Sequence, residues 1–382
     1  MTRDRELAAT YLDRLVREVE LQGALYDRRR RVTQLHWGGG TPTYFSEAQM
    51  RRLMTATDCC FTRAEGDAAE FGIELDPREV RPETLATLRV LGFNRVSLGV
   101  QDFDPAVQKA VNRIQSVAQT EHVVDEARAL GFRSVSVDLI YGLPFQTPAT
   151  VAATIAKVVT LAPDRISIYN YAHLPDRFPP QRRLDPASMP SPAAKLDLLQ
   201  LCIDRFGEAG YAYIGMDHFA LPTDDLAKAQ RDGALYRNFQ GYSTHADCDL
   251  VGLGMSAIGT VGGSFFQNTK TLDAYGAALD AGRLPTERGL VPDAEDRLRR
   301  AIIMQLICRF ELDFADFDVD FAAAFAPELR RLEAMAHDGL LTIDGAGIRV
   351  TDKGRFLIRN VCMVFDRYLG ANRDRPRFSR AI

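Results

Sequence analysis

The sequence predicts an α/β protein built around a parallel barrel. Short apolar and β-branched runs recur along the chain, and each is followed by a helical pattern with a capping or proline signal. Polar or glycine-rich segments follow several of these runs, at the strand ends where parallel barrels carry their chemistry. Near Thr286 this alternation of strand and helix patterns ends, and mainly helical patterns follow. We therefore expect a barrel with an extension over residues 1–285 and a mainly helical domain over residues 286–382.

The barrel elements follow from these local patterns. The expected strands cover residues 32–37, 70–75, 95–100, 134–140, 165–171 and, less regularly, 211–216. The expected helices cover residues 46–55, 81–91, 104–111, 117–130, 147–161 and 191–209. Pro82 indicates a helix start, and Gly92 and Gly131 stand where helices should stop.

The C-terminal domain should combine helices with one hairpin. Helical patterns cover residues 293–309, 327–338 and 352–369, and a hairpin should turn at residues 345–347. This arrangement resembles a winged-helix module, which a regulator would use to bind DNA. Acidic residues are interspersed throughout and no basic recognition face stands out. A structural cap or a substrate lid is therefore favoured over DNA binding.

Composition indicates an ordinary globular protein. The chain has 382 residues, 46% of them hydrophobic and 26% charged, with a net charge of -4. This charge gives no reason to expect a nucleic-acid partner. No apolar run approaches the roughly 20 residues that cross a bilayer, and the N-terminus lacks an apolar leader segment. We expect a cytoplasmic monomer that binds no membrane, and we expect the basic run at residues 28–31 to end the first helix.

No metal site or nucleophile is apparent in the sequence. An iron-sulfur cluster needs several thiolates that converge on one loop. The six cysteines are scattered, and we expect buried or incidental thiols at Cys59, Cys60, Cys202, Cys248, Cys308 and Cys362. The histidines at positions 36, 122, 173, 218 and 245 are isolated. His218 is the most plausible functional one, although a hydrogen-bonded structural role is favoured.

The first candidate binding segment is Gly38-Gly39-Gly40-Thr41-Pro42-Thr43, directly after a predicted strand. Glycines let the backbone approach a ligand and direct its N–H groups at a carboxylate or phosphate. Its spacing matches neither the P-loop nor the dinucleotide fingerprint. Glu74, at the end of the next strand, could accept hydrogen bonds from ribose hydroxyls or an ammonium group. Alternatively, Glu74 is a capping residue ahead of Pro77.

Further polar residues stand at later strand ends. Gln101 and Asp102 end the third strand, Arg113 follows one helix later, and Asp138 precedes a loop rich in apolar residues. Such a spread of amide, guanidinium and carboxylate groups suits a zwitterionic ligand that contains a nucleoside better than a proton-transfer pair. We find no Ser/His/Asp or Cys/His set that could form a catalytic nucleophile, which disfavours a hydrolase. The sequence alone does not identify the catalytic residues.

The motifs together resemble one enzyme family. They are HWGGGTPTY, IELDPRE, GVQDF, DLIYGLP, YIGMDHFA, RNFQGY, GLGMSAIG and the tail FSRAI. Their order and spacing are similar to those of the oxygen-independent coproporphyrinogen III dehydrogenases, also called anaerobic coproporphyrinogen oxidases, which are radical S-adenosylmethionine (SAM) enzymes. The resemblance extends from Thr2 to the end, and GMDHFA, RNFQGY and the C-terminal helices resemble this enzyme more than the related haem chaperone. It implies a partial (βα)6-type radical SAM barrel with a winged-helix-like C-terminal domain.

The resemblance also implies cofactors and a reaction. Two SAM molecules would bind, the first to Gly39, Glu74 and Ile258, and the second to Gly40, Thr41, Gln101, Arg113, Asp138 and Ala172. In the family, a [4Fe–4S] cluster reduces SAM to a 5'-deoxyadenosyl radical, which starts the decarboxylation of a propionate to a vinyl group. Two rounds convert coproporphyrinogen III to protoporphyrinogen IX in haem synthesis, with a further electron acceptor or donor of unknown identity.

One departure from the family pattern concerns the cluster. The family carries a CxxxCxxC loop ahead of the point where Met1-Thr2-Arg3 opens this chain. We therefore expect a truncated, inactive form without cluster ligands, and we hypothesise that a GTG valine codon was read as a start. Three clustered cysteine codons upstream would support this hypothesis, and stop codons would contradict it. The alternative is a cluster-less, haem- or SAM-binding paralogue similar to the haem chaperone.

Overall fold

The computed structural model describes residues 4–66 and 69–370, so the tail motif FSRAI lies outside the described residues. The chain forms two compact units. Unit 1 contains Met1–Val100, Gln115–Asp138 and Asp247–Pro292. Unit 2 contains Gln101–Ile114, Leu139–Ala246 and Asp293–Ile382.

Unit 1 is built on a parallel sheet. Its strands lie in the order β2 (Gln34–Trp37), β4 (Glu70–Leu75), β5 (Arg95–Gln101) and β6 (Ser134–Tyr141). Strand β4 is parallel to both β2 and β5. Every second residue of β4 is buried, as expected for a strand with one face on the core. The parallel sheet predicted from the sequence is confirmed.

The first predicted strand is divided in the structure. The expected strand over residues 32–37 appears as β1 (Arg31–Val32) and β2, separated by Thr33. Strand β1 pairs in parallel with β3 (Thr62–Arg63), whereas β2 pairs with β4. The two segments take different partners, so they cannot form one strand.

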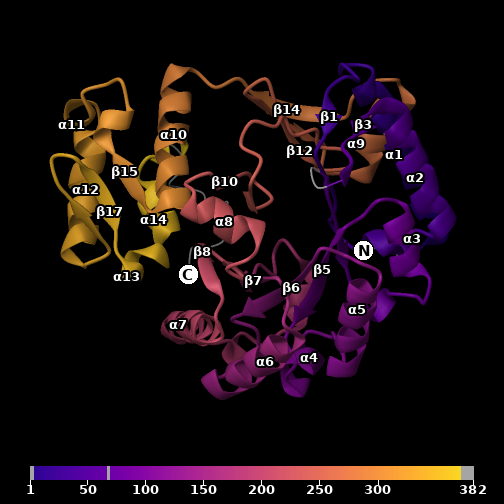
Figure 1. Cartoon of the computed structure of the whole chain (residues 1–382), viewed down its shortest axis with the longest axis horizontal. Coiled ribbons are helices and arrows are strands. Elements are labelled where there is room, and N and C mark those ends of the chain that lie inside the picture. Colours follow the sequence, from indigo (N-terminus) through magenta and orange to yellow (C-terminus); the bar gives the residue numbers. More distant parts are fainter. Residues whose placement is uncertain (1–3, 67–68, 371–382) are drawn as a thin grey trace. The chain divides into compact units, whose positions relative to one another are not determined.

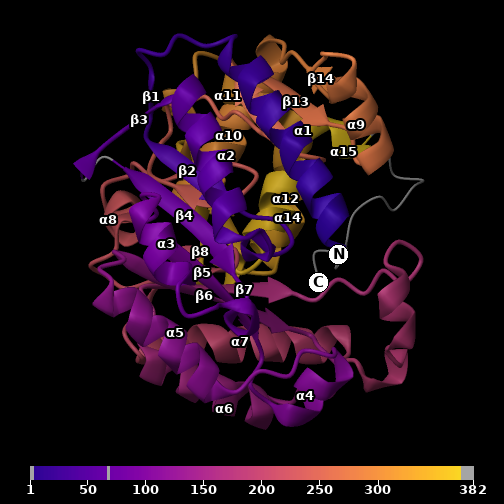
Figure 2. The same ribbon diagram turned by 90° about the vertical axis from the view of Figure 1, so that its right-hand side faces the viewer.

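Helices cover the strands of unit 1. They are α1 (Arg5–Gly23), α2 (Glu47–Cys60), α3 (Thr84–Val90), α5 (Val117–Ala129) and α9 (Leu272–Asp280). Helices α1 and α2 lie side by side (Figure 1) and bury Leu12, Val19 and Leu53 together. Figure 2 shows α9 along the other side of α1. Ser46 and Ser116 begin α2 and α5 with capping boxes, which satisfy the free N–H groups at the helix start.

The basic run at residues 28–31 does not end a helix, so that prediction was wrong. Helix α1 ends at Gly23 and has no basic residue in its last turn. The arginines lie beyond it, and two of them bind carboxylates. Arg29 pairs with Asp27 at 2.5 Å and Arg30 pairs with Asp249 at 2.8 Å.

An antiparallel sheet completes unit 1. It contains β12 (Ile258–Val261), β13 (Ser264–Asn268) and β14 (Thr286–Leu290) in that order. Gly262 and Gly263 join β12 to β13, and both have positive φ, as a tight hairpin turn requires.

Unit 2 contains a mixed sheet. Strands β6, β7 (Arg165–Asn170), β9 (His218–Ala220) and β8 (Ala212–Gly215) are neighbours in that order. Strand β9 is antiparallel to both β7 and β8. The segment 211–216 is therefore a strand, but it is no parallel barrel neighbour of β7. Only two residues join β8 to β9, and such a short link allows a hairpin but no crossover.

Further helices and one strand pair complete this part of unit 2. They are α4 (Pro105–Ala110), α6 (Pro148–Leu161), α7 (Pro192–Glu208), α8 (Asp225–Arg231), and the antiparallel pair β10 (Tyr236–Arg237) and β11 (Tyr242–Ser243). Helices α6 and α7 lie side by side in both views (Figures 1 and 2).

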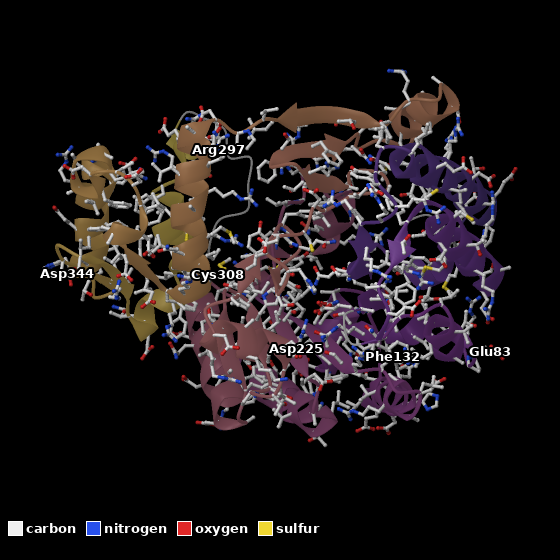
Figure 3. All side chains as sticks on the ribbon, turned by 45° about the horizontal axis from the view of Figure 1, so that its top comes forward. Glu83, Phe132, Asp225, Arg297, Cys308 and Asp344 are labelled. Atoms are coloured by element: carbon white, nitrogen blue, oxygen red, sulfur yellow. The ribbon has the colours of Figure 1, made fainter. Side chains whose placement is uncertain are left out.

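The C-terminal part of unit 2 contains two of the three predicted helices and the predicted hairpin. Its main elements are α10 (Ala294–Arg309), β15 (Glu311–Asp313), α11 (Phe321–Ala324), α12 (Ala326–His337), β16 (Leu341–Ile343) and β17 (Gly347–Val350). Strands β16 and β17 are antiparallel, and Asp344 lies in the turn between them (Figure 3). The predicted hairpin is confirmed.

The last predicted helix was wrong. Residues 352–369 form three short helices, α13 (Asp352–Arg355), α14 (Ile358–Met363) and α15 (Arg367–Gly370). The Gly354 backbone packs so tightly on the Leu340 carbonyl that a Cβ there would lie 1.8 Å from its oxygen. Val364 and Phe365 turn into the core between the last two helices. In the part of the chain that the structure describes, no helix combines the length and apolarity needed to span a membrane.

Candidate functional site

The glycine segment after β2 forms an open loop. Gly39 has φ 81° and Gly40 has φ 71°. Residues other than glycine adopt this backbone conformation only with strain. A Cβ on either residue would meet no atom within 4 Å. The glycines are thus required by the backbone conformation, and the space beside them is free for a ligand.

Glu74 is joined directly to this loop. One carboxylate oxygen accepts the Gly39 N–H at 3.0 Å, and the other lies 3.3 Å from His36 Nε2. Burial opposes ionisation of Glu74, but the hydrogen bonds from His36 and Gly39 outweigh it and hold its pKa below the ordinary value. A charged carboxylate at this position can accept hydrogen bonds from an ammonium group or from hydroxyls. The capping role considered as an alternative belongs instead to Asp76, whose side chain accepts from Arg78 N–H.

His36 is a part of the site that sequence reasoning missed. It was set aside as an isolated histidine, yet it faces Glu74 across β2 and β4. A signal was present in Gly72, which stands opposite His36 in the strand register. A Cβ on Gly72 would lie 3.3 Å from His36 Nδ1, so the glycine leaves room for the imidazole ring.

Asp138 and Ile258 also belong to unit 1. Asp138 accepts a hydrogen bond from Ser97 Oγ at 2.9 Å, so β6 and β5 contact each other through polar side chains. Ile258 begins β12 and pairs with Gln267 of β13. A Cβ on Gly252 would lie 2.4 Å from the Ile258 carbonyl oxygen. Gly252 therefore allows the GLGMSAIG segment to fold back on itself at Ile258.

Thr41 follows the glycines in unit 1, and the other predicted site residues, Gln101, Arg113 and Ala172, belong to unit 2. Gln101 has φ 68° at the end of β5, and the Arg113 N–H donates to the Gln108 carbonyl at 2.8 Å. The Ala172 carbonyl accepts a hydrogen bond from Gln181 Nε2 at 3.0 Å. Gln181 also accepts the Leu174 N–H, so one side chain fixes the segment after β7.

Lys195 is a second residue that the sequence analysis did not single out. Its ammonium group donates to Asn170 Oδ1 and to the Tyr171 carbonyl, both at 3.1 Å. Partial burial lowers the pKa of Lys195. A Cβ on Gly142 would lie 2.7 Å from Lys195 Cε. Lys195 therefore supports the strand ends after β6 and β7, but nothing in the helical pattern of α7 distinguishes it from a surface lysine.

His218 does not have the hydrogen-bonded ring expected of it. Among the described residues no partner reaches Nδ1, which is buried. The ring makes edge contacts with the Tyr169 and Tyr242 rings, 6.4 and 5.5 Å away. Burial, with a smaller effect of Arg237, lowers the pKa of His218 to about 3. The ring is therefore neutral at physiological pH and packs between aromatic side chains.

The cysteines are separate thiols in the structure. Cys202, Cys308 and Cys362 are buried, and Cys59 and Cys248 are exposed. Burial raises the pKa of Cys202 and of Cys308, which lies on α10 (Figure 3), to about 12, so both stay protonated. Over residues 4–66 and 69–370, no three His, Cys, Asp or Glu side chains are grouped so that they could hold a metal ion.

Comparison with known proteins shows which family this chain resembles. The pattern of the radical SAM superfamily matches residues 9–158, and that of the HemN C-terminal domain matches residues 293–357. A protein of Pseudomonas aeruginosa named oxygen-independent coproporphyrinogen III oxidase is 52% identical, over 100% of this chain and 84% of its own length. The Escherichia coli protein of the same name is 48% identical with the same coverage.

A solved structure agrees with these sequences. The coproporphyrinogen III oxidase (HemN) of Escherichia coli, described as a radical SAM enzyme, superposes with a TM-score of 0.92 at 48% identity. The superposition covers 96% of this chain and 85% of that one. The fold is therefore the radical SAM fold, with a parallel-rich sheet and a largely helical C-terminal region. This chain belongs to the family of oxygen-independent coproporphyrinogen III oxidases within the radical SAM superfamily.

Proposed function

We propose that this chain performs the oxygen-independent oxidation of coproporphyrinogen III to protoporphyrinogen IX, an oxidoreductase step of haem synthesis. Two propionate side chains lose carbon dioxide and become vinyl groups. The proposal rests above all on the Glu74 carboxylate, bonded to Gly39 N–H at an open glycine loop. This arrangement occurs in a chain that is similar from end to end to proteins of that name.

SAM fits the residues around this loop. It carries an ammonium group, a carboxylate and ribose hydroxyls, which match an ionised Glu74 and the N–H groups of a glycine backbone. The first SAM would be held by Gly39, Glu74 and Ile258. The second would be held by Gly40, Thr41, Gln101, Arg113, Asp138 and Ala172. When bound, SAM supplies the adenosyl group that starts the hydrogen abstraction.

The iron-sulfur cluster of the superfamily does not fit the described residues. Radical SAM proteins use a [4Fe–4S] cluster, which requires several thiolates on one loop. The six cysteines are dispersed over buried, intermediate and exposed positions, and the described residues contain no group of three His, Cys, Asp or Glu side chains that could hold a metal ion. In the proposed reaction the described residues would bind and orient SAM and the substrate.

The remaining features of the proposal concern the whole molecule. The reaction requires an electron acceptor, and the four carboxylates of coproporphyrinogen III require basic residues in the substrate pocket. We further propose a cytoplasmic monomer with a barrel and its extension over residues 1–285 and a structural cap or substrate lid over residues 286–382.

The test is an anaerobic assay with coproporphyrinogen III, SAM and a reductant, after reconstitution with iron and sulfide. Two forms are compared, the printed chain and the chain extended through any in-frame codons that precede Met1. Formation of protoporphyrinogen IX with consumption of SAM by either form supports the proposal. If neither form makes product but both bind SAM or haem, the chain is a binding paralogue and the proposed reaction is wrong.

A further inference from the structure

Gln101 and Phe145 are among the residues of unit 2 whose backbone conformation is disfavoured by their side chains. Gln101, which ends β5, has φ 68°, and Phe145, in the loop after β6, has φ 65°. The left-handed region is strained for residues with a Cβ and is unusual for a bulky aromatic residue. Strained positions of this kind gather at functional sites, where the surrounding structure holds them in place.

A buried carboxylate stands next to the first of these residues. Asp102 is only 2% exposed. Its carboxylate accepts hydrogen bonds from Thr154 Oγ1 at 2.7 Å, from Gln146 Nε2 at 2.6 Å and from the Asp104 N–H at 2.8 Å. Its carbonyl accepts a hydrogen bond from Gln108 Nε2 at 2.9 Å. The residue that follows Gln101 is thus fixed through both its side chain and its backbone.

The same network continues to the second strained residue. Gln146, which follows Phe145, donates from Nε2 to the Ile140 carbonyl and accepts the Leu143 N–H, both at 2.9 Å. The Phe145 N–H donates to the Ser188 carbonyl at 2.9 Å. One pair of side chains, Asp102 and Gln146, therefore joins the loop after β5 to the loop after β6.

Packing does not explain why a phenylalanine occupies the strained position. The Phe145 side chain is 55% exposed, so its ring contributes little to the core. Glycine would adopt the same φ without strain. An exposed aromatic residue held at a cost beyond the end of a sheet strand is better explained by an apolar ligand that covers the ring.

We propose that Asp102 and Gln146 are positioning residues, which hold Gln101 to bind SAM and Phe145 to contact the apolar face of the tetrapyrrole. This inference rests on the proposed function, which supplies both ligands. Asp102 and Gln146 act only through the conformation of their neighbours. Phe145 is the residue of this group that touches the substrate.

The test measures ligand affinity in full-length variants. The probes are SAM and coproporphyrin III, the stable oxidised form of the proposed substrate. Asp102→Asn places an amide opposite the Gln146 amide and should weaken binding of both ligands roughly tenfold to a hundredfold, as the loss of supporting residues does at other sites. Thr154→Val removes the hydroxyl that donates to Asp102 and accepts the Phe103 N–H, and it keeps the side-chain shape. It should act in the same direction if Asp102→Asn does not fold.

Glycine variants separate positioning from a purely structural role. Phe145→Gly should raise the thermal midpoint, because it relieves strain, and should weaken binding of coproporphyrin III but not of SAM. Gln101→Gly should weaken binding of SAM. The effects of Asp102→Asn and Gln101→Gly on SAM affinity should not add, because Asp102 acts through Gln101.

Asp104→Asn is the matched control. Asp104 lies in the same loop but caps α4, and asparagine caps helices equally well. This variant should leave both affinities unchanged. If the wild-type chain binds neither probe, the proposed function fails. If it binds both and Asp102→Asn and Thr154→Val bind them equally well, only the positioning inference is wrong.

Discussion

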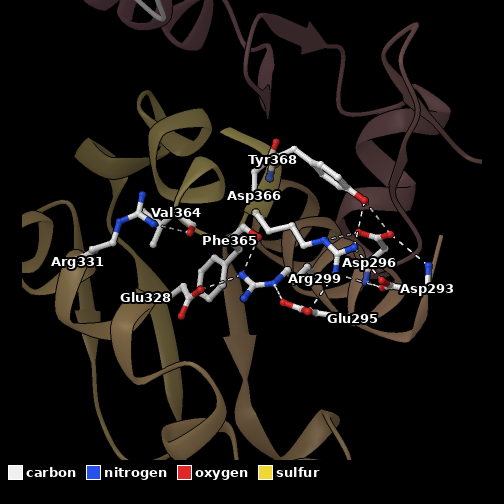
Figure 4. Close-up of polar contacts among 11 residues, drawn as sticks. Asp293, Glu295, Asp296, Arg299, Glu328, Arg331, Val364, Phe365, Asp366 and Tyr368 are labelled. Atoms are coloured by element: carbon white, nitrogen blue, oxygen red, sulfur yellow. Dashed lines mark hydrogen bonds and ion pairs between the residues drawn. The ribbon is translucent and has the colours of Figure 1, made fainter. Parts of the chain in front are cut away.

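The carboxylates of the glycine loop and those of the C-terminal arginine cluster are used in opposite ways. Near the C-terminus, Arg367 pairs with Asp293 at 2.8 Å and with Glu295 and Asp296 at 3.0 Å each (Figure 4). In contrast, Glu74 is bonded to one backbone N–H and one histidine ring, beside glycines whose Cβ positions are empty. The carboxylates around Arg367 are thus paired with a cation, whereas the Glu74 carboxylate can still accept hydrogen bonds from a ligand at an open surface.

This difference separates structural charges from binding charges. Arg299, beside Arg367, pairs with Glu295 at 2.8 Å and with Glu328 at 2.9 Å. A winged helix that binds DNA needs cations for the phosphates, but these two arginines hold α10 to the segments around it (Figure 4). The comparison predicts that changes at the glycine loop alter affinity, and that changes in the arginine cluster alter stability only.

The largest effect should come from Gly39→Val. Valine at φ 81° is strained, and its side chain fills the open space beside the loop. We expect a loss of SAM affinity of more than about a hundredfold in an equilibrium titration. Gly131→Val is the matched control, because Gly131 has φ 75° and equally open surroundings at the end of α5. Equal losses of SAM affinity in both variants would contradict the assignment of the loop.

Glu74→Gln should have the next largest effect. The amide keeps the size of the side chain but removes the charge, and hydrogen bonds to charged groups stabilise by about 1.5–3 kcal/mol, so SAM affinity should fall roughly tenfold to a hundredfold. Glu70→Gln is the control on the same strand, where Glu70 pairs with Arg95 at 2.9 Å. The control should lose stability and keep its SAM affinity.

The pH dependence of the wild type provides a second check on Glu74. Its pKa lies below the ordinary value, so its contribution to stability is present above that value and is lost as the pH falls through the folded-state pKa. SAM affinity should therefore not decrease between neutral pH and about pH 5 on account of Glu74. If SAM affinity decreases around neutral pH as the pH falls, and Glu74→Gln removes this decrease, the pKa of Glu74 is raised and not lowered.

Glu18→Ala should mainly reduce stability. Glu18 is fully buried on α1 and accepts hydrogen bonds from the Gly254 N–H, Asn268 Nδ2 and the Tyr275 hydroxyl. Its removal leaves these donors unpaired, and we expect the free energy of unfolding to fall by about 3 kcal/mol in denaturant titrations. An unchanged free energy of unfolding would mean that these donors find other partners.

The pH dependence of Glu18 should have the opposite sign to that of Glu74. Burial raises the pKa of Glu18, even though its three hydrogen bonds act against this shift. The folded state therefore favours its protonated form, and this contribution to stability is lost as the pH rises through the folded-state pKa. The free energy of unfolding of the wild type, measured at a series of pH values, should fall as the pH rises through this pKa. The Glu18→Gln variant should not show this decrease.

The smallest effect should come from Arg367→Ala. Surface ion pairs contribute little and are screened by salt. We expect a small loss of thermal stability relative to wild type, largest at low ionic strength, and no change in SAM affinity. A clear loss of SAM affinity would show that the arginine cluster contributes to binding as well as to structure.

The strands of the parallel sheet were predictable because their sequence patterns are local. The expected strand over 70–75 coincides with β4, in which buried residues alternate with partly exposed ones. The antiparallel pairing of β9 with β7 was not predictable, since it depends on which partner a three-residue strand meets. The last predicted helix failed because the close approach of Gly354 to Leu340 is a tertiary contact that helical periodicity does not reveal.

The candidate site was predicted in part for the same reason. Glycines after a strand and a glutamate at the end of the next one are visible in the sequence, and the structure joins Gly39 to Glu74. His36 became recognisable only through the register of β2 against β4. The network of Asp102 and Gln146 joins two loops that are 44 residues apart, and neither residue type marks such a contact in a sequence.

The most direct test of the binding site is hydrogen–deuterium exchange of the full chain with and without SAM. We expect SAM to slow exchange in the peptide that spans Gly38–Tyr44 and to leave the peptides around Arg299 and Arg367 unchanged. Protection confined to the C-terminal peptides, or no protection of the glycine loop at saturating SAM, would contradict the assignment of this loop as the binding site.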